Sequence, residues 1–84
     1  MSEAEKDTAR AVKAAVAIFD NRDPEKEASN ILVTLEGLIT LVLLAVMKND
    51  ERNAAKMLDV GVVPGVERRL ALAKSKAVGG HTEQ

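Results

Sequence analysis

The chain has 84 residues, of which 46% are hydrophobic and 30% are charged. This length predicts one domain with a marginal core. The single aromatic residue argues against a protein that binds nucleic acid by stacking on bases. The lack of cysteine excludes disulfides and thiolate metal sites. The formal net charge is −1. It divides into −3 over residues 1–60 (eight basic, eleven acidic) and +2 over residues 61–84 (four basic, two acidic). This asymmetry is too small to indicate nucleic-acid binding.

A first helix is expected over residues 3–20. Ser2 and Glu5 have the spacing of a capping box, in which each side chain bonds a backbone N–H at the other end of the first turn. Val12, Val16 and Phe19 recur at three- and four-residue spacing, which predicts one apolar stripe. The residues before them are acidic and polar, so we expect no secretory leader.

A second helix is expected over residues 24–48, with Asp23 as its N-cap and Pro24 at its first position. From residue 31 to residue 47 the chain is apolar nearly all round a helix, which predicts a central position. Gly37 indicates either close packing of another backbone or a break. These 17 residues have about the minimum length of a helix that crosses a membrane. Because Glu36 lies among them, we favour a helix buried in the protein over a membrane-spanning one.

Two shorter helices are expected over residues 51–60 and 64–78. Asn49 and Asp50 cap the first, and Gly61 should take left-handed geometry at its end. A turn over residues 63–65 then leads into the last helix, which Gly79 and Gly80 should end. The sequence contains no run that alternates long enough for a strand. We therefore predict an all-α, small four-helix bundle, a single domain over residues 1–78 with a disordered tail over residues 79–84.

The order of segments over residues 23–75 resembles a single armadillo-type helical repeat. An acidic turn, a proline and a long apolar helix are followed by a short helix ending in Leu58-Asp59-Val60-Gly61 and by Val62-Val63-Pro64-Gly65-Val66. In that family, a Gly followed by a hydrophobic residue and a Pro marks the corner between the second and third helices. The resemblance implies a surface that binds protein, and no chemistry.

No set of side chains predicts catalysis. His81 is the only histidine and follows two glycines in the expected tail, so it has no neighbours to complete a metal site. The carboxylate pairs Glu3/Asp7 and Asp23/Glu27 fall in first turns of helices, where the backbone dipole favours them. No glycine-rich phosphate loop is present. We expect no enzyme activity, no cofactor, no metal and no small-molecule substrate.

A narrow polar seam on the second helix holds Ser29, Glu36 and Thr40. It is either the strip that meets solvent, which we favour, or a buried carboxylate paired with Arg10 or Arg69 that fixes the register of a bundle or dimer. The residues expected to form a dimer or core seam are Val12, Val16, Phe19, Glu36, Thr40 and Leu43.

The last helix carries a leucine ringed by cations, a candidate site for an acidic partner surface. The residues predicted to bind this partner are Arg68, Arg69, Leu72 and Lys76. A solvated flank with one stray leucine is the alternative. Nucleic acid is possible but not favoured; such a regulator would place the same cations and Lys74 on phosphates.

These features predict a small interaction protein in the cytoplasm, a homodimer or the partner of a larger protein, acting as an adaptor or inhibitor by surface occupation. Compact accessory proteins of phages or mobile elements fit this description. The rival is a nucleic-acid-binding regulator that uses the basic C-terminal helix.

Overall fold

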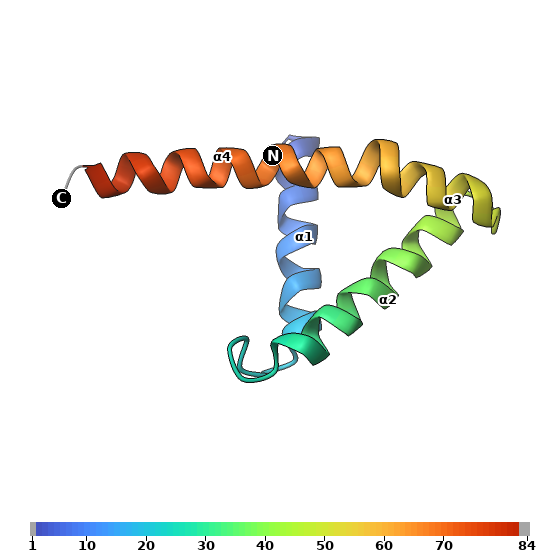
Figure 1. The fold of residues 1–84 in the computed structure, drawn as a ribbon, viewed down its shortest axis with the longest axis horizontal. Coiled ribbons are helices and arrows are strands. Elements are labelled where there is room, and N and C mark those ends of the chain that lie inside the picture. The colour runs from blue at the N-terminus through green and yellow to red at the C-terminus, as the bar shows by residue number, and fades with distance from the viewer. Residues whose placement is uncertain (1, 83–84) are drawn as a thin grey trace. The chain divides into compact units, whose positions relative to one another are not determined.

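The computed structural model describes the backbone of residues 2–82 and the side chains of residues 2–75, and helices joined by short turns make up this part of the chain (Figure 1). The predicted all-α class is confirmed. The elements in chain order are α1 (Glu3–Phe19), α2 (Ala28–Val46), α3 (Glu51–Met57), the π-helical segment η1 (Leu58–Val62) and α4 (Val63–Thr82).

Helix α1 begins and ends as its sequence predicts. The Ser2 hydroxyl accepts the Glu5 backbone N–H at 3.2 Å, and Glu5 Oε1 accepts the Ser2 backbone N–H at 3.1 Å, so the capping box is confirmed. At the other end Asp20 and Asn21 both take left-handed backbone angles, with φ of 47° and 61°. Asp and Asn tolerate this geometry better than most residues, which explains why the helix stops there.

Helix α2 begins at Ala28, four residues later than predicted. Asp23 acts as a cap, because its Oδ1 accepts the backbone N–H groups of Glu25 and Lys26 at 2.9 and 3.4 Å. However, it caps only a single turn over residues 24–27, which ends before α2 starts. Lys48 and Asn49, both left-handed with φ of 54° and 63°, follow the end of α2.

Helix α2 runs without interruption through Gly37. A Cβ built on Gly37 would meet no atom within 4 Å, apart from the helix's own nearby backbone. Neither reason that the sequence offered for this glycine, a break or close packing of another backbone, therefore holds in the single chain.

The segments α3, η1 and α4 form one continuous run of helical backbone (Figure 1). Within residues 2–82 the chain thus forms three helical runs, and the prediction of a four-helix bundle is wrong. Asp50 caps the third run as predicted, since its Oδ1 accepts the Asn53 N–H at 3.0 Å.

The predicted corner near Gly61 and Pro64 is absent from this run. No glycine in the described backbone has a positive φ, and the N–H of Val63 bonds the carbonyl of Leu58, five residues back. A proline inside a regular α-helix clashes with the carbonyl four residues earlier, and a wider π-turn relieves this conflict. The chain therefore passes Pro64 without turning. Gly79 and Gly80, expected to end α4, lie within it, and residues 83–84 of the predicted tail lie outside the described residues.

The chain divides into two compact units, Met1–Leu41 and Val42–Gln84, and α2 crosses the boundary. The prediction of one domain over residues 1–78 stays a prediction. Few of the described side chains are buried: Ile31 in the first unit, and Leu43 and Ala54 in the second. The expectation that α2 is a buried central helix is wrong for the isolated chain, because α1 faces only one side of it and most of its large side chains are exposed.

Candidate interaction surfaces

The predicted apolar stripe of α1 is a solvent-exposed surface. Val12, Val16 and Phe19 are all exposed, and α1 buries none of its side chains. A different side of α1, which carries Ala14, Ala17 and Ile18, faces α2. These residues line an open space between the two helices, so they do not replace the burial that the stripe would supply.

An open groove separates α1 from the first part of α2. Its lining residues are Ala14, Ala17, Ile18, Thr34, Gly37, Leu38 and Leu41. The only polar side chain among them is the Thr34 hydroxyl, whose own hydrogen bond goes to the Asn30 carbonyl at 3.1 Å. The groove offers apolar contact and no titratable group for acid–base chemistry.

Arg22 holds the junction at one end of this groove. Its guanidinium donates to the backbone carbonyls of Ile18 and Phe19 at the end of α1, and to Thr34 Oγ1 of α2 at 3.2 Å. A cation at this position also interacts favourably with the negative end of the helix dipole. Arg22 therefore serves as the C-terminal cap of α1 and as a link to α2.

The predicted polar seam of α2 meets solvent. Glu36 and Thr40 are exposed, and the Thr40 hydroxyl donates to the Glu36 backbone carbonyl at 2.8 Å. Arg10, one of the two arginines considered as a partner for Glu36, instead bonds Asp7 at 2.6 Å. Leu43, the last member of the predicted seam, is buried. The dimer or core seam expected from these six residues stays a prediction.

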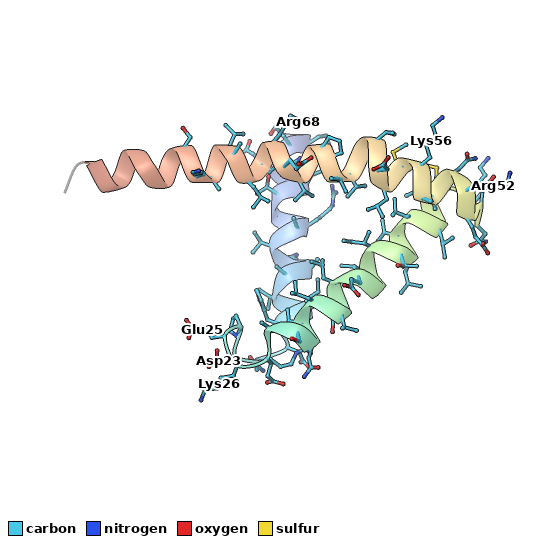
Figure 2. The ribbon with its side chains drawn as sticks, in the orientation of Figure 1. Asp23, Glu25, Lys26, Arg52, Lys56 and Arg68 are labelled. Atoms are coloured by element: carbon cyan, nitrogen blue, oxygen red, sulfur yellow. The ribbon has the colours of Figure 1, made fainter. Side chains whose placement is uncertain are left out.

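The cation-ringed leucine of α4 is fully available for contact. Leu72 is 63% exposed, and Arg68, Arg69 and Lys74 are exposed as well. Figure 2 shows Arg68 projecting from α4. The side chain of Lys76, the fourth predicted member, lies outside the described residues. No ion pair in the described part of the chain includes either arginine, so both charges are open to a partner.

The electrostatics of the described side chains are those of a solvated surface. The two ion pairs, Lys6–Glu3 and Arg10–Asp7, are both exposed and three residues apart on α1, a class that contributes little to stability. Hydrogen bonds from the Ser2 backbone and then its side chain lower the pKa of Glu5 below its ordinary value of 4.5. No group of His, Cys, Asp or Glu that could hold a metal ion occurs among the described residues.

Sequence reasoning missed a second apolar line on α2, which we call the heptad seam. Its members follow one another at spacings of three, four, three and four residues: Leu32, Leu35, Ile39, Val42 and Val46. At 3.6 residues per turn they lie within an arc of about 80°, the pattern of a coiled-coil a/d line. The spacing was present in the sequence, but the apolar residues all round this helix concealed it.

No protein family, no curated protein and no solved structure matches this chain. The resemblance of residues 23–75 to an armadillo-type repeat therefore stays a prediction, and any function must be inferred from the surfaces of the molecule itself.

Proposed function

We propose that this chain is a small protein–protein interaction module of the cytoplasm, which acts without catalysis as an adaptor or inhibitor by occupying a surface of its partner. The observation that carries the proposal is the exposure of large apolar side chains on every long helix. Among the side chains of residues 2–75, which the structure describes, sixteen large apolar ones are exposed, while Ile31, Leu43 and Ala54 are buried. Burial of one large apolar side chain contributes about 1.5–3 kcal/mol, so a partner that covers several of them gains substantial free energy.

The contact that we propose for the partner is the basic surface of α4, defined by Arg68, Arg69 and Leu72, together with Lys76. An exposed leucine supplies apolar contact, and the arginines can form bidentate hydrogen bonds with carboxylates. Arg and large apolar residues are typical of energetically important interface positions. This chemistry fits an acidic protein surface.

Two charge reversals on α4 test this contact. Arg69→Glu changes the basic surface, and the matched control Lys74→Glu makes the same change about 140° away on the same helix. With affinity-tagged chain expressed in cells that carry its gene, we expect a stoichiometric protein to be recovered with the wild type and the Lys74→Glu variant. Recovery with Arg69→Glu should fall at least about tenfold.

Two outcomes would contradict the proposal. Equal recovery with all three chains would show that the basic surface is not the contact. A salt-sensitive shift of DNA in a gel, weakened equally by Arg69→Glu and Lys74→Glu, would favour the nucleic-acid regulator, because phosphate contacts depend on the number of cations rather than on one face.

A lipid bilayer is the other environment that could cover α2. By length and composition alone, α2 could cross a membrane. Glu36, however, lies next to the midpoint of this helix, where a charged side chain costs a few kcal/mol in the bilayer centre. Within about 20 residues of the helix, four Lys or Arg residues precede it and three follow it, so the basic residues show no strong bias toward one end. We therefore favour a protein partner.

A further inference from the structure

We propose that α4 carries a second docking surface, which takes a helix with acidic flanks from a partner protein. The surface consists of Val63, Val66, Leu70 and Ala73, which we call the α4 line. The inference rests on the proposed function as an interaction module and names the form and the charge of the partner segment. It concerns the side of α4 opposite Leu72, so the two contacts can be tested separately.

The α4 line has the spacing of a coiled-coil seam. Its members follow one another at intervals of three, four and three residues. At 3.6 residues per turn they lie within an arc of about 80°, as do the a and d positions of a heptad. Leu72 lies about 140° from the centre of this arc, among the cations of the basic surface. Helix α4 therefore has two distinct sides.

The α4 line is exposed. Val63, Val66 and Leu70 are 42%, 47% and 63% exposed, and Ala73 is exposed as well. The backbone of α3 and η1 continues into α4 as one helical run, so these segments precede α4 along its axis (Figure 1). Valine and leucine at a and d positions pack as knobs into the holes of a facing helix, and their burial there is favourable.

The charges beside the α4 line favour an acidic partner. In the heptad that places Leu70 at an a position, Arg69 and Lys76 take g positions, while Glu67 and Lys74 take e positions. Three cations and one anion give these flanks a net charge of +2. Because e and g residues lie beside the facing helix, a partner helix with Glu or Asp at its own e and g positions is attracted in either orientation.

The same charges argue against a second copy of α4 as the occupant. In a parallel pair each g position faces an e position of the next heptad, so Arg69 would meet Lys74 of the other copy. In an antiparallel pair g faces g and e faces e, so repulsion between Arg69 and Lys76 offsets attraction between Glu67 and Lys74. Neither self-pairing gains from charge, whereas an acidic helix does.

A synthetic helix tests this docking surface on the full chain, whatever the natural partner is. The probe is a fluorescent peptide of three heptads with Ile at a, Leu at d and Glu at every e and g position. The control peptide has Lys in place of each of these Glu residues. Fluorescence anisotropy at about 0.1 M salt should show at least about tenfold tighter binding of the Glu peptide. Equal affinity for the two peptides, or binding of neither, would overturn the proposal.

Two leucines of α4 provide a matched pair of variants. Leu70 belongs to the α4 line and Leu72 to the basic surface, and each is 63% exposed. Leu70→Ala should weaken binding of the Glu peptide at least about tenfold, and Leu72→Ala should change it by less than about twofold. Because alanine favours helix, both variants should keep the circular dichroism of the wild type. Equal effects of the two substitutions would contradict docking on the α4 line.

The proposed function and this inference can fail separately. If a chain that binds neither peptide still captured a partner in an Arg69-dependent manner, the proposed function would stand and the inference would fall. Binding of the Glu peptide that depends on Leu70, without any captured partner, would retain the docking surface and remove the adaptor. Flotation with vesicles that contain phosphatidylserine, lost in Leu70→Ala while the Glu peptide does not bind, would assign the α4 line to an anionic lipid surface and overturn the helix.

Discussion

The first turn of α1 shows what single residues can determine without tertiary packing. Ser2 and Glu5 are both exposed, yet each satisfies a backbone N–H of the other. The interaction lowers the pKa of Glu5 below 4.5, with the hydrogen bond from the Ser2 backbone as its main cause. The ionised carboxylate is therefore the form that holds the first turn.

Acidification should fray this turn. Because the folded pKa of Glu5 lies below its unfolded value of 4.5, its stabilisation of α1 is present above that value and is lost as the pH falls through the folded pKa. Backbone ¹³C shifts of the first turn, followed by NMR from about pH 6 to about pH 2.5, should show helicity falling in the wild type. Glu5→Gln should remove this component, and an unchanged profile in that variant would assign the loss to another carboxyl group.

Helix α2 shows how an element can carry a residue that its fold does not require. Gly37 has a negative φ, and an added Cβ would meet no atom within 4 Å apart from nearby backbone of its own helix. Gly37→Ala should therefore stabilise the chain by about 0.5–1 kcal/mol through helix propensity alone. Urea unfolding followed by circular dichroism, at one fixed protein concentration, measures this change.

Ala45→Gly is the matched control for this prediction, because it makes the reverse change at an exposed position of the same helix. It should destabilise the chain by about the same amount. A loss of stability in Gly37→Ala would contradict the prediction and would show that another backbone packs against Gly37 in solution.

At the level of elements, the sequence predicts most helix starts because local capping chemistry decides them. Ser2 and Asp50 cap as expected, and Asp20 and Asn21 end α1. The corner at Gly61 and Pro64 could not be predicted, because a π-turn lets a helix pass a proline and this depends on backbone geometry rather than on residue type. The same limit explains why three helical runs were counted as four helices.

At the scale of the whole molecule, the sequence predicted the all-α class but not where its apolar surface would lie. Helical periodicity identifies which residues share a face, whereas burial depends on what covers that face. Val12 and Val16 form the predicted stripe and remain exposed, while Leu43 is buried. Charge and spacing define the basic surface of α4 already in the sequence, and its role in binding stays a prediction. The heptad seam was missed because apolar neighbours surround it.

A homodimer, one of the two partnerships expected from the sequence, would make the stability of the whole molecule depend on its concentration. If a second copy completes the core, unfolding is coupled to dissociation, and each tenfold rise in concentration adds about 1.4 kcal/mol per dimer. With about 2.1 cal/mol/K of unfolding entropy per residue, this raises the Tm of a pair of 84-residue chains by about 4 °C. Circular dichroism melts of a homodimer should therefore shift by about 8 °C over a hundredfold concentration range. A wild-type Tm that stays constant over this range would mean that the chain folds alone, because only a unimolecular transition is independent of concentration.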